Sequence, residues 1–192
     1  FTWGLCWPKG KVNRDSGFDL LSSDREDIPV QSWPLAYWPD GSLKWTGHAV
    51  PATALTQAAF QLSPTSKVKS LQGMKVEESD TTIMIDTGEL LYTIPKSGNQ
   101  IISSIQKGEK TLAQNAQLVV LHQNVSDEDA AEQIRKTKFQ GNISKISLEQ
   151  KGPLRSVVKI EGSHRSEAGR DFITYVVRLY FYYQAASFKM VH

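Results

Sequence analysis

One stretch decides the fold: QSWPLAYWPDGSLKWTGHAV, residues 31–50. Two arms of alternating side chains flank a central Pro39-Asp40-Gly41-Ser42. Proline presets φ and glycine accepts positive φ, so this tetrapeptide is typical of a tight turn. Period-two alternation on both sides of such a turn predicts a β-hairpin. Pro34, inside the first arm, places that arm at a sheet edge or in a bulge.

The same period-two alternation continues along the chain after the hairpin. Glycine-containing turn signals separate further strand-like runs; they are Thr87-Gly88, Ser97-Gly98-Asn99, Lys107-Gly108-Glu109, Gly152-Pro153 and Ala168-Gly169. The expected strands cover residues 59–62, 74–78, 82–86, 90–94, 101–106, 118–122, 143–149, 155–162 and 172–183. This spacing predicts an all-β fold, a barrel-like or sandwich β domain of about 10–13 short antiparallel strands.

One segment departs from the β pattern. Residues 126–136 begin with a serine cap, continue with acidic residues and end in basic ones, an order that favours a short surface helix. We expect a single N-terminal β domain over residues 1–192, with a possible lobe boundary near residues 62–73. Because residue 1 is Phe and residues 188–192 still alternate like a strand, we expect a piece excised from a longer protein.

Composition narrows the class of protein. The 192 residues are 40% hydrophobic, and 22 basic residues nearly balance 20 acidic ones. We therefore expect no nucleic-acid partner. No apolar run reaches the roughly 18 residues of a membrane span, so none is expected. The single cysteine, Cys6, has no disulfide partner in the chain, and we expect it to be packed and inert.

Local motifs assign no catalytic chemistry. The four histidines lie far apart without a second ligand at motif spacing, so we expect no metal and no cofactor; they are His48, His122, His164 and His192. No nucleophile elbow or phosphate-binding loop is present in the sequence. Asp40 is interpreted as a turn-forming residue before a catalytic acid. We assign no catalytic residue.

The tryptophans are the most informative side chains. All five lie within the first 45 residues, at positions 3, 7, 33, 38 and 45. Indole rings stack on sugar rings, so Trp33, Trp38 and Trp45, with the neighbouring cation Lys44, are candidate carbohydrate-binding residues. Because Trp33 and Trp38 differ by an odd number, strict alternation would put them on opposite faces of their strand. The alternative is that the tryptophans form the core of the packed strands.

The N-terminal residues resemble a known family. Phe1-Thr2-Trp3-Gly4, Trp7-Pro8-Lys9-Gly10 and residues 31–48, above all Trp38-Pro39-Asp40-Gly41-Ser42-Leu43-Lys44-Trp45, are similar to the N-terminal domain of the exo-rhamnogalacturonan lyase-like family. The resemblance implies a RIFT-barrel-type β domain ahead of a larger catalytic region that this chain lacks. The family reaction would be β-elimination beside a galacturonate, and Lys44 or Arg155 could contact such an acidic sugar from a domain edge.

Three functions remain open at this point. The first is an N-terminal β domain of a secreted or periplasmic polysaccharide-degrading enzyme, which supports the catalytic region and borders its sugar cleft. Its partners would be the missing catalytic region and an acidic polysaccharide, and the domain alone would lack lyase activity. The second is an autonomous carbohydrate-binding module that uses surface tryptophans. The third is a structural domain without a ligand.

Overall fold

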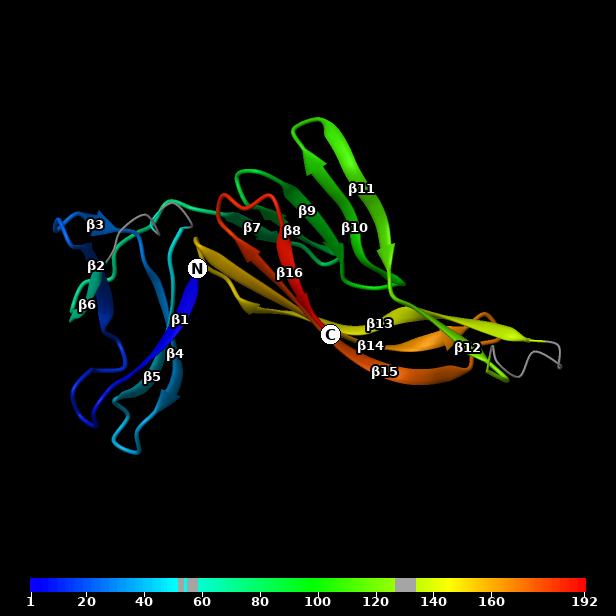
Figure 1. Cartoon of the computed structure of the whole chain (residues 1–192), viewed down its shortest axis with the longest axis horizontal. Helices are drawn as coiled ribbons and strands as arrows, with labels where there is room; N and C mark the ends of the chain where they lie inside the picture. The colour runs from blue at the N-terminus through cyan, green and yellow to red at the C-terminus, as the bar shows by residue number, and fades with distance from the viewer. Residues whose placement is uncertain (52–53, 55–58, 127–133) are drawn as a thin grey trace. The chain divides into compact units, whose positions relative to one another are not determined.

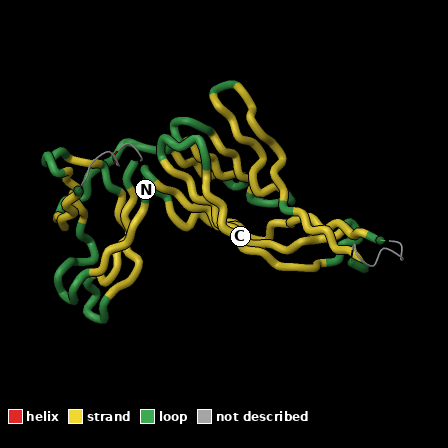
Figure 2. The backbone as a smooth tube through the Cα atoms, viewed as in Figure 1, coloured by secondary structure: helices red, strands yellow, loops and turns green. Residues whose placement is uncertain are grey.

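The regular secondary structure of the described residues is almost entirely β-strand. The computed structural model describes residues 1–51, 54, 59–126 and 134–192. In this described part, sixteen strands are joined by turns and loops (Figures 1 and 2). Contacts divide the chain into two compact units. The first unit comprises Phe1–Met74, Gly152–Arg155 and Tyr182–Gln184; the second comprises Lys75–Lys151, Ser156–Phe181 and Ala185–His192.

The first unit contains two three-stranded antiparallel sheets. One has the order β1-β5-β4, with β1 at Thr2–Cys6, β5 at Leu43–Ala49 and β4 at Gln31–Tyr37. The other has the order β3-β2-β6, with β3 at Asp27–Ile28, β2 at Gly17–Ser22 and β6 at Phe60–Thr65. The blue-to-cyan strands in Figure 1 are these six.

Aromatic rings join the two sheets of the first unit. The Phe18 ring, from β2, meets the His48 ring from β5 edge-on at 5.1 Å and the Trp7 ring at 5.6 Å. Small apolar clusters complete the core, and they contain Val12, Phe18 and Leu43 in one and Leu20, Ile28 and Val50 in the other. Burial of these side chains stabilises the unit by about 25 cal/mol per Å² of apolar surface removed from water.

The second unit contains two five-stranded sheets. The order of the first is β11-β10-β9-β8-β7, with bounds Lys110–Gln117, Gln100–Lys107, Leu91–Pro95, Thr82–Asp86 and Lys75–Glu78. The order of the second is β12-β13-β14-β15-β16, with bounds Val119–Gln123, Lys136–Gln150, Arg155–Ser166, Asp171–Tyr182 and Phe188–Val191. The β10–β11 hairpin and the long strands β13–β15 are seen in Figure 1.

An apolar core lies between these two sheets. Strands β8 and β9 contribute side chains with no exposed surface, namely Ile83, Ile85, Tyr92 and Ile94. The facing strands contribute Val158, Ile160, Val177, Leu179 and Phe181, also fully buried. The rings of Tyr92 and Phe181 lie 4.8 Å apart, so the sheets pack face to face as in a β-sandwich.

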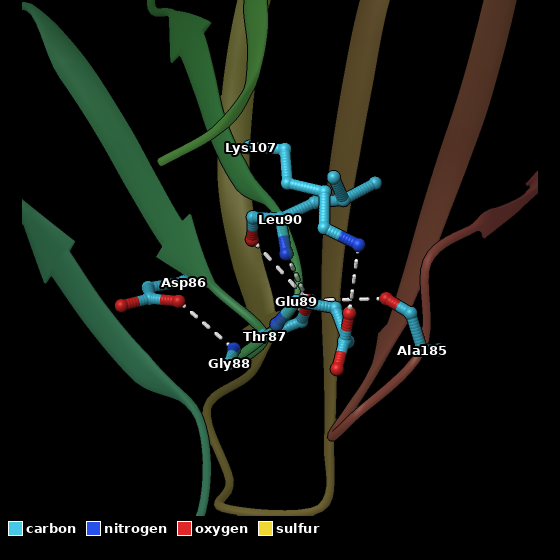
Figure 3. Close-up of polar contacts among 7 residues, drawn as sticks. All are labelled: Asp86, Thr87, Gly88, Glu89, Leu90, Lys107 and Ala185. Atoms are coloured by element: carbon cyan, nitrogen blue, oxygen red, sulfur yellow. Dashed lines mark hydrogen bonds and ion pairs between the residues drawn. The ribbon is translucent and has the colours of Figure 1, made fainter. Parts of the chain in front are cut away.

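A buried threonine ties two turns of the second unit together. Thr87, at the end of β8, donates its hydroxyl toward the carbonyls of Leu90 and Ala185 at 3.2 and 3.1 Å. The same oxygen accepts hydrogen bonds from the amides of Glu89 and Leu90 (Figure 3). The β8–β9 turn is thereby held to the turn between β15 and β16.

The hairpin and the all-β class predicted from the sequence are confirmed. Gly41 has φ of 84°, as the turn requires. Pro34 lies on the edge strand β4 and beside a bulge, so both explanations for it hold. The sequence missed β1, β2, β3 and β11, and the strand count exceeds the expected one for that reason. The expected helix falls mainly on residues 127–133, outside the described residues.

Candidate functional site: the outer face of the β4–β5 hairpin

Strand register places two of the candidate tryptophans on one face. Trp33 pairs with Gly47, and Gly47 lies two residues from Trp45, so Trp33 and Trp45 share the outer face of the β1-β5-β4 sheet. Thr46 and His48 alternate with them and are fully buried on the inner face. The hairpin thus has a core face without tryptophan and an outer face with two.

Trp33 is held in place by its surroundings. Its indole lies so close to Gly47 that a Cβ on residue 47 would stand 2.4 Å from the ring. The Arg155 guanidinium lies over the same ring, 4.7 Å from its centroid. Trp33 is therefore packed between Gly47 and the Arg155 guanidinium, and its ring restricts the position of that cation.

Trp45 is the most accessible tryptophan of this face. Its side chain is 43% exposed, and Leu35 nearby on β4 is 58% exposed. In register, Trp45 pairs with Cys6 on β1 and with Ala36 on β4. Cys6 is exposed, so the expectation of a packed thiol is wrong; edge strand β1 directs it outward beside Trp45. Small neighbours leave the Trp45 ring open to a flat ligand.

Trp38 and Lys44 form a separate pair at the turn end of the hairpin. The Lys44 ammonium lies 4.6 Å from the Trp38 ring centroid, and Trp38 Nε1 donates to the Trp7 carbonyl at 3.0 Å. Two register shifts lie between Trp33 and Trp38, at Pro34/Ala36 and at Ala36/Tyr37. Strict alternation therefore does not apply between them, and the parity argument from the sequence fails.

Gln31 fixes the segment that carries Arg155. Its amide oxygen accepts hydrogen bonds from the amides of Leu154 and Arg155, both at 2.8 Å, and its Nε2 donates to the Arg155 carbonyl at 3.0 Å. Gly152 packs against the same amide, where a Cβ would stand within 2.1 Å of Nε2. No local sequence signal pairs Gln31 with residues more than 120 positions away.

The inner face carries a buried polar chain. Trp7 Nε1 donates to Thr46 Oγ1 at 2.8 Å, and Thr46 Oγ1 is hydrogen-bonded to His48 Nε2 at 2.7 Å. His48 Nδ1 is in turn hydrogen-bonded to Ser32 Oγ at 2.8 Å. Burial lowers the pKa of His48 from 6.5 to about 4. His48 is therefore a neutral structural residue near pH 7.

A polar hollow lies at the turn end of the first unit. This loop-end cleft has a volume of about 930 Å³ and is formed by Gly10, residues 13–16, residues 40–42 and residues 64–66. Asp40 lines it, and the hydrogen bonds from Ser42 lower the pKa of its carboxyl group. Arg14, which the sequence did not single out, lines it too and lies 4.9 Å from the Tyr37 ring centroid.

The described residues contain no group of three or more His, Cys, Asp or Glu side chains able to hold an ion. His122 contacts the Phe172 ring, and His164 is hydrogen-bonded to the Ile173 carbonyl.

Across the described residues, no helix has the length and apolar character needed to cross a membrane.

Comparisons with known proteins divide the chain in two. Residues 1–65 match the model of the PcRGLX-like N-terminal RIFT barrel domain, and residues 74–192 match that of the PcRGLX-like protein central beta sandwich domain. An uncharacterized protein, YetA of Bacillus subtilis (strain 168), is 32% identical over all 192 residues of this chain. The chain spans only 22% of that relative's length.

Proposed function

The chain belongs to the PcRGLX-like family, and from this premise we propose that it is the N-terminal part of a rhamnogalacturonan lyase-like enzyme that holds an acidic polysaccharide on the outer face of its β4–β5 hairpin. Trp45 would stack on a sugar ring. Arg155 and Lys44 would pair with uronate carboxylates. The catalytic region would lie in the remainder of a longer, secreted or periplasmic protein, and this chain alone would not cleave the polymer.

The observation that carries the proposal is the pairing of exposed aromatic surface with fixed cations. Trp45 offers an open ring, and Arg155 and Lys44 are each positioned over another tryptophan of the same hairpin. An aromatic face suits the apolar side of a sugar, and a guanidinium matches a carboxylate through paired hydrogen bonds. A neutral polysaccharide would use the ring but not the cations.

Tryptophan fluorescence tests the proposal directly. We expect a saturable shift when the 192-residue chain is titrated with rhamnogalacturonan oligosaccharides, and none with neutral xylan fragments. Trp45→Ala should remove the binding while lowering the free energy of unfolding by about 1–2 kcal/mol, because the residue is 43% exposed and only partly packed. The matched control is Phe172→Ala, an exposed aromatic of the second unit, which should bind like the unchanged chain.

Two outcomes would contradict this assignment. Absence of any shift at millimolar sugar would favour a structural domain whose tryptophans only pack. Equal shifts with acidic and neutral oligosaccharides would favour a general carbohydrate-binding module in which Arg155 and Lys44 take no part. Arg155→Gln sharpens the second case, since it removes the cation and leaves Trp45 unchanged.

A further inference from the structure

The loop-end cleft contains a carboxylate that is fixed before any ligand arrives. Asp40 Oδ1 accepts hydrogen bonds from the Ser42 amide at 3.0 Å and the Ser42 hydroxyl at 2.6 Å. Ser42 Oγ itself accepts a hydrogen bond from the Gly10 amide at 2.9 Å, which joins two of the loops that form the cleft. Both bonds from Ser42 go to Oδ1, so neither of them involves Oδ2.

A cation on the same cleft is also held in place. The Arg14 guanidinium stacks over the Tyr37 ring, 4.9 Å from its centroid. Stacking restricts the long side chain and leaves its N–H groups at the ring edge free to donate. The cleft therefore combines a fixed acceptor with a fixed donor on neighbouring loops, the 10–16 loop and the hairpin turn.

The charge and shape of the cleft limit what it can bind. Its lining has two acidic side chains, Asp15 and Asp40, and one basic side chain, Arg14, and the charge of Lys9 also acts on Asp40, so the charges balance and a ligand of either net charge gains little. Most of its lining residues are polar and none has a large apolar side chain, unlike the residues of the apolar pockets that hold hydrophobic ligands. A small neutral ligand with several hydroxyl groups meets these conditions.

We propose that the loop-end cleft binds a neutral sugar through two adjacent hydroxyl groups, with Asp40 accepting from one hydroxyl and Arg14 donating to the other. A carboxylate and a guanidinium on neighbouring loops suit a vicinal diol, because each hydroxyl both donates and accepts. This site is separate from the Trp45 surface and takes the opposite class of ligand, uncharged rather than acidic. It does not depend on the proposed function.

Backbone amide NMR shifts locate such binding. The 192-residue chain is titrated with methyl α-L-rhamnopyranoside and methyl β-D-galactopyranoside, two neutral cis-diol glycosides, at millimolar concentration. We expect the largest shifts at the amides of Gly10, Gly41 and Ser42. Asp40→Asn keeps an oxygen for Ser42 but removes the charged acceptor, and should weaken binding about tenfold. Asp24→Asn, an exposed carboxylate in another turn, should bind like the unchanged chain.

Several results would overturn this site. Shifts centred on residues 45–47 would place the neutral sugar at the Trp45 surface instead, and no shifts would mean that the cleft has no sugar ligand. Unchanged affinity in Asp40→Asn would remove the carboxylate from the site. Shifts of the same amides by calcium chloride without sugar would assign the cleft to a cation. Binding of acidic oligosaccharides near Trp45 is measured by tryptophan fluorescence in a separate titration. A negative NMR result for the cleft therefore does not contradict the proposed function.

Discussion

The two units of this chain bury different kinds of side chain in their cores. The first unit buries a polar chain at its centre, in which the fully buried His48 is hydrogen-bonded between Ser32 and Thr46. The second unit buries isoleucine, valine and aromatic side chains around Tyr92 and Phe181. A hydrogen-bonded core that contains a histidine is sensitive to protonation, whereas a core of apolar side chains is sensitive mainly to loss of volume. The comparison therefore predicts different responses to pH and to truncation.

Truncating the apolar core should have the largest effect. Phe181→Ala removes a fully buried ring that packs against Tyr92 and Phe188, and should lower the free energy of unfolding of the second unit by about 3–5 kcal/mol. All five tryptophans lie in the first unit, so urea unfolding followed by tryptophan fluorescence reports on that unit, and circular dichroism on both. If the fluorescence midpoint falls as far as the dichroism midpoint, the units do not unfold separately.

The second-largest effect is expected from acid, which should lower the stability of the first unit. The pKa of His48 is about 4 in the folded chain and 6.5 when unfolded, so the unfolded state binds the proton first as the pH falls. The stability present above pH 6.5 is lost progressively toward pH 4, by about 3 kcal/mol in total. Fluorescence-detected unfolding from pH 7 to 4 measures it. If the free energy of unfolding of the first unit does not change over this pH range, the pKa of His48 is not lowered by folding.

Removing one buried hydroxyl from the second unit should cost less. Thr87→Val keeps the shape but leaves the carbonyls of Leu90 and Ala185 and the amides of Glu89 and Leu90 without this partner. We expect a loss of about 1–3 kcal/mol in dichroism-detected unfolding. Thr111→Val, on the exposed strand β11, is the matched control and should change little. Equal effects of the two variants would mean that the turn contacts around Thr87 contribute nothing.

The smallest effect is expected at the second unit's surface. Arg178 donates to both oxygens of Glu149, at 2.7 and 3.0 Å, but both side chains are partly exposed. Arg178→Gln should therefore cost less than about 1 kcal/mol, and less still in high salt. A larger loss that persists at 1 M salt would show that this pair, rather than the apolar core, organises the sheet.

The sequence predicts the local part of the fold well. The turn at residues 39–42 and the alternation around it identify the β4–β5 hairpin, and strand β8 matches its expected bounds. In strand β2, Gly17–Ser22, burial alternates, but the residue types follow it only over Phe18-Asp19-Leu20, because Leu21 is partly exposed and Ser22 is buried. The sequence predicts only part of the candidate site. It identifies the tryptophans and Lys44, but it does not predict the β-bulges that decide which face of the sheet each side chain occupies. Arg155 reaches Trp33 through a contact that only the folded chain creates.

The Gln31 contacts have a consequence for how the protein is made. The first unit includes Gly152–Arg155 and Tyr182–Gln184, and the Gln31 side chain finds its three backbone partners only in the first of these segments. During synthesis the six N-terminal strands leave the ribosome long before residues 152–155 exist. Until then the Gln31 side chain lacks these three partners, and the cation that stacks on Trp33 is missing. The N-terminal unit is therefore the first to be translated and among the last to be completed.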